Sequence, residues 1–489
     1  MDASVIVVGA GPAGLMLAGE LRLVGIDVVV IDRLAERTGE SRGIGFTART
    51  MEIFDQRDLL RRFEKLATGT FAHFGGIPLD LGVLGPGHLA ARNVPQSVTE
   101  AVLEKWARDL GADIRRGQEF LGLEQSADSV GIRVGTAAGE ETVTARYLVG
   151  CDGGRSGVRQ AAGFDFPGTP ATTELLLADV RGVEIEQRMI PDGISGGMVM
   201  TAPLGDGVHR VIVAEHGAPP RRRAEPPEFG EVADAWKRLT GVDISHGELV
   251  WASAFGDAAR LVTEYRRGRV LLAGDSAHVH LPAGGQGMNT SIQDSVNLGW
   301  KLAAVLRGAA TDSLLDTYHS ERHEVGRGLL LNTKAQSKLI LGGEDVQPLR
   351  GVLGELTAYP EVARHLAAKA GGLDIRYDVG GGSHPLLGLR MPRLELAGPA
   401  RSTSTTELLR TGRGVLLDLE GNAHLRRRAE PWQDRVDVVT ARPAAVPGGS
   451  LLKDTGCVLL RPDGHVAWAA PGSRDDLPTA LARWFGPPR

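Results

Sequence analysis

The first thirty residues combine two short apolar runs with a segment of helical periodicity between them. Residues 4–8 (SVIVV) and 28–31 (VVVI) are continuous and mostly β-branched, as expected for buried parallel strands. Residues 15–23 place apolar side chains at helical spacing, and Gly25 follows them as a helix-ending residue. The pattern therefore predicts a strand–helix–strand unit with two parallel, buried strands.

The turn between the first strand and the helix reads Gly9-Ala-Gly-Pro-Ala-Gly14. In such a turn the first glycine allows the tight bend, Gly11 lets the backbone approach a pyrophosphate, and the last lets helix and strand pack closely. The helix N-terminus offers N–H donors to a phosphate, and Pro12 fits the first helical turn. Asp32, at the end of the second strand, can accept hydrogen bonds from ribose hydroxyls. We predict a dinucleotide-binding unit.

Two further motifs follow. Residues 147–156 (YLVGCDGGRS) contain an Asp-Gly pair at Asp152, and residues 268–282 (GRVLLAGDSAHVHLP) contain a Gly-Asp pair at Asp275. A buried strand is predicted over residues 270–273, which puts Asp275 at its carboxyl end, where open α/β sheets bind ligands. The glycine-rich residues 283–287 lead into a helix that we expect to begin near Met288.

The three motifs, in this order, resemble those of the FAD-dependent aromatic hydroxylases, the group that includes para-hydroxybenzoate hydroxylase and phenol hydroxylase. The resemblance implies that the helix start near Met288 faces the flavin pyrimidine edge, that Pro282 lies near the reactive flavin C4a, and that Arg42 and Gln96 reach the cofactor. It assigns no proton-transfer side chain. The expected FAD contacts are Gly9, Gly11, Pro12, Ala13, Gly14, Asp32, Arg33, Arg42, Gln96, Asp152, Asp275, Pro282, Gly285, Gly287, Met288 and Asn289.

The pattern changes over residues 172–253. Strands are predicted over 175–180, 198–202 and 208–215, with Gly205-Asp-Gly207 as a hairpin turn between the last two. We interpret this segment as an antiparallel sheet inserted into the nucleotide-binding domain, with one face forming a wall of the substrate cavity. The candidate substrate contacts are Phe74, Pro78, Met198 and Met200.

The remainder of the chain predicts a helical region over residues 307–370, a linker at 380–385 and a third domain. The third domain has the strand–helix–strand, then strand–strand–helix order of a thioredoxin-like fold, without the Cys-x-x-Cys pair of thiol redox proteins. We therefore predict an α/β protein with a Rossmann-like FAD-binding domain (1–171 and 254–380), a middle substrate-binding β-sheet domain (172–253) and a thioredoxin-like C-terminal domain (386–489).

Composition argues against several classes of protein, among them nucleic-acid-binding, membrane and disulfide-rich proteins. The 489 residues carry a formal net charge of −5, which offers no general attraction to nucleic acid or to an anionic membrane. The Arg221–Arg223 triplet is interpreted as a solvated loop, and no membrane span or signal peptide is predicted. Two cysteines favour a reducing cytoplasm over a disulfide scaffold. We expect no metal site and interpret His278 and His280 as packed or hydrogen-bonded histidines.

The whole chain resembles the actinobacterial polyketide oxygenases, most closely the angucycline hydroxylases. The resemblance implies a monooxygenase that uses FAD, NAD(P)H (NADPH rather than NADH) and O₂ to hydroxylate an angular aromatic polyketide through a flavin C4a-hydroperoxide. Two alternatives stay open: a flavin monooxygenase that inactivates an aromatic antibiotic, and a non-catalytic flavoprotein sensor. A homo-oligomer is possible, whereas nucleic acid and membrane are not expected as partners.

Overall fold

The computed structural model describes the chain except for residues 42, 65, 86, 88, 93, 222, 398–401, 445–451 and 453. Its largest sheet has the strand order β19-β20-β11-β1-β2-β8, and β9 and β10 extend it from β11. The strands from β20 to β8 pair in parallel. The bounds are β1 (Ala3–Val8), β2 (Val28–Asp32), β8 (Asp113–Arg116), β9 (Glu119–Gln125), β10 (Val130–Thr136), β11 (Gly139–Gly150), β19 (Arg266–Arg267) and β20 (Val270–Leu272).

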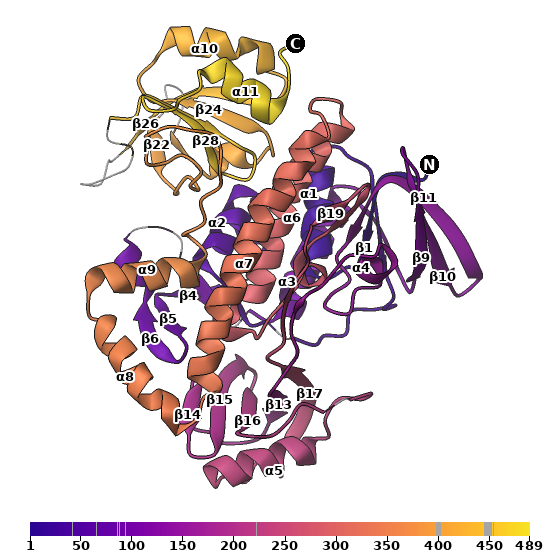
Figure 1. Ribbon diagram of the computed structural model, residues 1–489, viewed down its shortest axis with the longest axis vertical. Coiled ribbons are helices and arrows are strands. Elements are labelled where there is room, and N and C mark those ends of the chain that lie inside the picture. Colours follow the sequence, from indigo (N-terminus) through magenta and orange to yellow (C-terminus); the bar gives the residue numbers. More distant parts are fainter. Residues whose placement is uncertain are drawn as a thin grey trace.

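Helices α1 and α6 pack against each other beside this sheet, and the strands β9 and β10 that extend it lie at the right of Figure 1, away from these helices. The two helices approach closely at Gly299 of α6, which has no side chain. A Cβ built on Gly299 would lie only 2.6 Å from the Cβ of Glu20 in α1. Ser295 Oγ of α6 also donates to the Ala13 carbonyl of α1 at 2.7 Å. The helices are α1 (Pro12–Leu23), α2 (Ala48–Gln56), α3 (Gln96–Asp109), α4 (Gly157–Ala161), α5 (Phe229–Thr240), α6 (Gln286–Leu306), α7 (Ser313–Leu341), α8 (Gln347–Leu356), α9 (Pro360–Gly371), α10 (Ala423–Ala429) and α11 (Leu477–Phe485).

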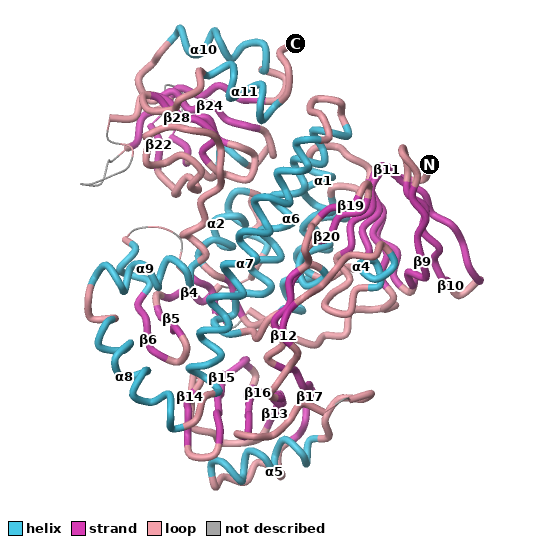
Figure 2. The backbone as a smooth tube through the Cα atoms, in the orientation of Figure 1, coloured by secondary structure: helices cyan, strands magenta, loops and turns pink. Residues whose placement is uncertain are grey.

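The middle of the chain forms a five-stranded sheet with the order β14-β15-β16-β13-β17, in which every pairing is antiparallel. Figure 2 shows α5 running beneath these strands, at the end of the molecule opposite the C-terminal domain. The three predicted strands are confirmed, and Asp206 occupies the hairpin turn with φ 50°. The bounds are β13 (Glu174–Arg181), β14 (Asp192–Ile194), β15 (Gly197–Gly205), β16 (Val208–Glu215) and β17 (Glu248–Gly256).

The C-terminal segment contains a four-stranded sheet of order β25-β24-β27-β28. Strands β24 and β25 are parallel, and the other two pairings are antiparallel. Helix α10 connects the parallel pair, and α11 follows the last strand (Figure 1). The bounds are β24 (Gly414–Asp418), β25 (Val436–Thr440), β27 (Cys457–Leu460) and β28 (Val466–Ala470).

The remaining strands are short and form small sheets between these larger units. They are β3 (Gly45–Phe46), β4 (Ala67–Gly69), β5 (Phe71–Phe74), β6 (Ile77–Asp80), β7 (Ala90–Arg92), β12 (Gly168–Thr169), β18 (Ala259–Leu261), β21 (His278–Val279), β22 (Glu395–Ala397), β23 (Ser402–Ser404) and β26 (Arg442–Pro443). Among the described residues, we find no helix with the length and hydropathy that a membrane span requires.

Candidate functional site

The turn from β1 to α1 leaves a space beside Gly11. Gly9 has φ 107°, and a Cβ there would lie 2.3 Å from the carbonyl oxygen of Cys151. A Cβ on Gly14 would lie 1.9 Å from the Gly9 carbonyl oxygen. By contrast, a Cβ on Gly11 would meet no atom of the described residues within 4 Å. The first and third glycines are thus required by the fold, whereas Gly11 borders open space at a helix N-terminus, as a phosphate cradle requires.

The Asp32 carboxylate fixes this turn from the end of β2. Its Oδ2 accepts from the backbone N–H of Ala10 at 2.7 Å, and its Oδ1 accepts from the N–H of Leu34 at 2.9 Å. Each carboxylate oxygen has a second lone pair, so Asp32 can also accept from a ribose hydroxyl. Arg33, next to it, is exposed.

The loop after β11 lies directly against the first turn. A Cβ on Gly9 would be 3.0 Å from Cα of Asp152. The Asp152 carboxylate accepts from Ser156 Oγ at 2.5 Å and from the Val158 N–H at 3.1 Å, so it caps α4. Arg159 then donates to the carbonyl oxygens of Ser276 at 3.0 Å and Gly154 at 2.8 Å. This arginine joins the Asp-Gly loop to the Gly-Asp loop, two motifs that are far apart in the sequence.

Asp275 stands exposed beyond the carboxyl end of β20, three residues after Leu272. Its carboxylate makes no hydrogen bond or ion pair with any described residue, although the neighbouring backbone is firmly held. The Gly274 N–H donates to Asp294 Oδ2 at 3.0 Å. A fixed backbone with a free carboxylate at the sheet edge suits a ligand hydroxyl.

The following loop and the start of α6 form the opposite side of the space. Gly284 and Gly285 both have φ 68°, and the left-handed Gly285 caps α6, which begins at Gln286 rather than near Met288 as expected. Pro282 and Gly285 are exposed, and no described atom lies within 4 Å of a Cβ on Gly285. The α6 N-terminus, with the expected contacts Gly287, Met288 and Asn289, thus borders open space.

Asn289 and Gln96 hold the neighbouring backbone against this helix start. Asn289 Oδ1 accepts from the Thr47 N–H at 2.9 Å, and its Nδ2 donates to the Gly285 carbonyl at 2.8 Å. Gln96 Oε1 accepts from the Gly43 N–H at 3.3 Å. A Cβ on Gly43 would lie 3.4 Å from Cε of Met288, so this loop reaches the α6 N-terminus. Arg42, the expected cofactor contact in that loop, lies outside the described residues.

Beneath the Gly-Asp loop lies a buried ionic network that the sequence motifs do not reveal. Asp294 of α6 accepts from His278 Nε2 at 2.8 Å and from Arg322 Nε of α7 at 2.6 Å. All three side chains are inaccessible to solvent. Burial opposes ionisation of Asp294, but Arg322 and His278 outweigh it and lower the pKa of that carboxyl. His278 is therefore hydrogen-bonded, as interpreted, and it supports the loop that carries Asp275.

The candidate substrate contacts are only partly brought together. Met198 of β15 is 2 % exposed and belongs to an apolar cluster with Leu281 and Ala283, the residues on either side of Pro282. Met200 packs against the same cluster. Phe74 ends β5, which lies against residues 283–285.

Pro78 is the exception, because it is exposed on β6 and is not part of this cluster. The sheet face with Met198 and Met200 therefore adjoins the Pro282 loop, whereas Pro78 does not contribute to that apolar surface.

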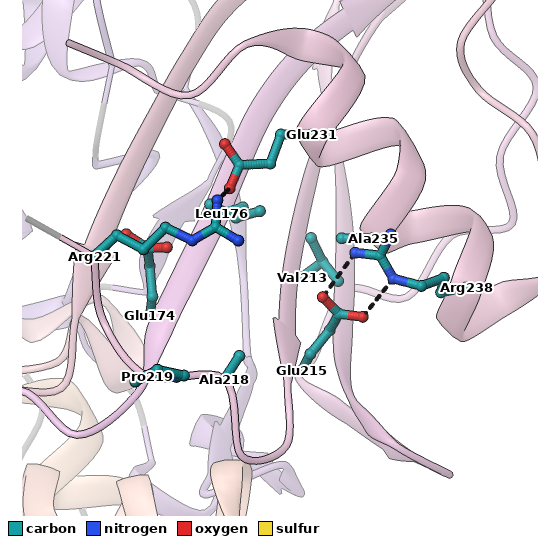
Figure 3. Close-up of a pocket in the computed structure, with 10 residues that line it drawn as sticks. All are labelled: Glu174, Leu176, Val213, Glu215, Ala218, Pro219, Arg221, Glu231, Ala235 and Arg238. Atoms are coloured by element: carbon teal, nitrogen blue, oxygen red, sulfur yellow. Dashed lines mark hydrogen bonds and ion pairs between the residues drawn. The ribbon is translucent and has the colours of Figure 1, made fainter. Parts of the chain in front are cut away.

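A separate small cavity lies within the middle domain, between α5 and its sheet, with a volume of about 80 Å³ (Figure 3). Ion pairs line it: Arg238 meets Glu215 at 2.8 Å, and Arg221 meets Glu231 at 2.8 Å. Arg223 bonds Glu174 and Glu231. Two of the three arginines at 221–223 thus hold a loop against α5, and Arg222 lies outside the described residues.

Comparisons with known proteins find relatives of this chain over its full length. A family model described as "FAD binding domain" matches residues 2–333, and a model described as "Aromatic-ring hydroxylase, C-terminal" matches residues 384–488. The chain is 42% identical over 508 residues to an anhydrotetracycline monooxygenase of Streptomyces rimosus, with 100% of both chains covered. It is also 42% identical to a rifampicin monooxygenase of Streptomyces venezuelae, covering 99% of this chain and 98% of that protein.

Among solved structures, CabE, an aromatic hydroxylase from angucycline biosynthesis, is 62% identical to this chain. The two structures superpose with a TM-score of 0.98 over 100% of both chains.

Proposed function

This chain belongs to the FAD-binding aromatic-ring hydroxylases, a family of flavin-dependent aromatic monooxygenases, and from this premise we propose that it hydroxylates an angucycline-type aromatic polyketide with NAD(P)H and O₂. The assignment of an angucycline-type substrate rests on the full-length likeness to the angucycline hydroxylase CabE. NADPH is the proposed reductant.

The residues at the sheet edge fit FAD. Gly11 and the α6 N-terminus border open space from two sides, and Asp275 offers an unpaired carboxylate between them. We propose that the first turn with Asp32 holds the adenosine and pyrophosphate, that Asp275 holds the ribityl chain, and that Gly287 to Asn289 hold the flavin pyrimidine edge. When bound there, FAD would supply hydride acceptance and the activation of dioxygen.

The chain's own residues have the tasks of binding, orienting and keeping water away. The N–H groups and dipole of α6 stabilise negative charge at the helix start. Pro282 presents no N–H to the reacting face. The apolar cluster of Met198, Leu281 and Ala283 gives a flat aromatic substrate a dry surface beside that loop, which matters because water diverts activated oxygen to hydrogen peroxide.

The experiment is substrate-dependent oxidation of NADPH by the FAD-loaded enzyme with a panel of angucyclines, tetracyclines and simple phenols, followed by mass analysis of the products. The proposal expects a hydroxylated angucycline formed in near-equal amount to the NADPH consumed. Oxidation of NADPH without a hydroxylated product from any angucycline would contradict it.

A second candidate is inactivation of an aromatic antibiotic, favoured by the likeness to a rifampicin monooxygenase. The same panel separates the two functions when rifampicin is included. If the enzyme inactivates the antibiotic, we expect it to convert rifampicin into a product that no longer inhibits bacterial growth, and to leave angucyclines unchanged.

We also propose the domain limits 1–171 with 254–380, 172–253 and 386–489. The continuous antiparallel sheet from β13 to β17 supports the middle unit. A thioredoxin-like fold for the last unit is supported by the order β25-β24-β27-β28 with one parallel pair. We assign it a packing role, and we propose a cytoplasmic location and a capacity to form homo-oligomers.

A further inference from the structure

The imidazole of His280 lies beside the first turn of α6. A Cβ built on Gly287 would be 3.6 Å from His280 Nε2 and 3.7 Å from its Cε1, so this edge of the ring faces the helix start. His280 stands two residues before Pro282, in the segment that joins β21 to α6. It therefore borders the space in which we propose that the flavin pyrimidine edge binds.

Hydrogen bonding fixes which ring nitrogen of His280 can accept a proton. Its Nδ1 lies 2.6 Å from the Leu281 carbonyl oxygen, so Nδ1 carries a hydrogen and donates it. The lone pair is then on Nε2. That atom makes no hydrogen bond to any described residue, and the ring is partly exposed. His278 differs, because it is fully buried and bonded to Asp294 through Nε2. Nδ1 of His278 also has no partner among the described residues, but that side chain is buried, whereas the His280 ring is partly exposed and faces the start of α6.

We propose that His280 takes up a proton at Nε2 when FAD is reduced, and so offsets the negative charge that reduction places on the flavin. The inference rests on the proposed function, because it requires FAD in this cradle. Hydride transfer from NAD(P)H brings two electrons and one proton, which leaves the flavin with one negative charge. The Nε2–H bond then forms with a proton from solvent, and the positive charge of the His280 ring balances the negative charge of the flavin.

The groups around the ring are compatible with this role. Burial is the largest influence and lowers the pKa of His280, and the nearby His278 lowers it further, whereas the hydrogen bond to the Leu281 carbonyl and the nearby Asp275 act in the opposite direction. Arg260, on the neighbouring strand β18, is directed to the Phe166 carbonyl. At this corner α6 and α7 present the uncharged amides of Gln286 and Asn332.

The lowered pKa favours the neutral ring before reduction. A negative charge close to Nε2 raises the pKa of an imidazole, because opposite charges favour the protonated form. Reduction of the flavin is thus expected to shift His280 from its neutral to its charged state near neutral pH.

The experiment measures the pKa of His280 directly in the FAD-loaded protein. Histidine labelled with ¹³C is incorporated, and the Cε1–H signals are titrated in the oxidised protein and again after anaerobic reduction with dithionite. The signal that is absent from the H280Q variant identifies the residue, and H280N serves if the glutamine variant does not fold. The proposal expects reduction to raise the proton affinity of His280 at least tenfold.

One control variant and two contradicting outcomes separate this inference from the proposed function. H424N removes an exposed histidine of the C-terminal domain and should leave the His280 titration unchanged. A His280 pKa that stays constant or falls on reduction would overturn this inference and leave the proposed function intact. Failure of the chain to bind FAD would overturn both. As a second readout, wild-type protein should take up more protons per two electrons than H280Q in potentiometric titrations near neutral pH.

Discussion

Arg461, in the turn between β27 and β28, forms a two-pronged ion pair with Glu321 of α7. The Nη1–Oε1 and Nη2–Oε2 distances are 2.5 and 2.9 Å, and neither side chain is appreciably exposed. Lys301 of α6 adds a second cation, with Nζ 2.7 Å from Glu321 Oε2. The next residue of α7, Arg322, holds Asp294 beneath the Gly-Asp loop. The C-terminal domain is thus fixed to the two helices that support the proposed flavin site.

Replacing Glu321 by glutamine should destabilise the protein strongly. The change keeps the shape of the side chain but removes the buried carboxylate that Arg461 and Lys301 share, so that Asp463, the other buried partner of Arg461, is the remaining counter-charge. Breaking a buried pair typically costs about 3–5 kcal/mol. We expect a clear fall in the urea midpoint, measured by fluorescence. The exposed pair of Arg133 and Glu140 provides the control, since E140Q should change the midpoint little. Equal midpoints for wild type and E321Q would refute the assignment.

The same pair predicts a pH dependence of stability. Burial alone would raise the pKa of Glu321, but Arg461 and Lys301 hold it at about 2 against an ordinary value of 4.5. A lowered folded-state pKa contributes stability that is complete above the unfolded value and is lost as pH falls through the folded value. The stability gap between wild type and E321Q should therefore narrow as pH falls from 4.5 to 2. A gap that widens on acidification would contradict this.

The sequence predicts the first turn well because its information is local. Gly14 and Asp32 make their contacts within one strand–helix–strand unit, and short-range spacing determines such a unit. The close contact of Gly9 with Cys151 lies outside that unit, but the glycine spacing that predicts the turn is local. The start of α6 was predicted two residues late, because its cap is the left-handed Gly285 and not a capping side chain.

The pairs formed by long-range packing could not be predicted. Asp294 and Arg322 are 28 residues apart on different helices, and Arg461 and Glu321 are 140 apart. Each reads as an ordinary charged residue in its own helix or turn, and only the packing of α6, α7 and the C-terminal domain brings the partners together. The antiparallel strands β9 and β10 were likewise not predicted, since several alternating positions in β9 are only partly buried.

Substituting Gly11 by valine should abolish FAD retention. The added side chain would enter the open space at the α1 N-terminus where we propose that the pyrophosphate lies, and its Cβ would have no atom of the described residues within 4 Å. The fold should therefore survive while the flavin absorbance of the purified protein disappears. G230V, at an exposed glycine of α5 with similar free space, should keep its flavin. Recovery of yellow, FAD-bound G11V protein would count against the cradle.

Replacing Asp275 by alanine should weaken FAD binding without unfolding the protein. The exposed carboxylate makes no hydrogen bond or ion pair with the described residues, so its loss breaks no such contact within the protein and removes the proposed contact with the ribityl chain. One charged hydrogen bond contributes ~1.5–3 kcal/mol, or roughly 10- to 150-fold in affinity. Fluorescence titration of apoprotein with FAD measures the change, with D128A as a control at an exposed aspartate. Wild-type affinity in D275A would exclude the role.

Shortening Met200 to alanine should increase uncoupled turnover. The side chain packs on the apolar cluster beside Pro282, and its removal opens that surface to water. We expect more hydrogen peroxide per NADPH oxidised and a higher KM for the aromatic substrate. V250A, at a half-exposed valine of β17, should couple as wild type does. An unchanged peroxide yield in M200A would show that this sheet face is not the substrate wall.

Insertion of one atom of dioxygen into the aromatic polyketide can be followed directly by incubating the FAD-loaded enzyme with NADPH and an angucycline under ¹⁸O₂ and measuring the product by mass spectrometry. We predict one ¹⁸O atom in each new hydroxyl group. A product that carries only oxygen from water, or an angucycline recovered unchanged while NADPH is consumed, would contradict it.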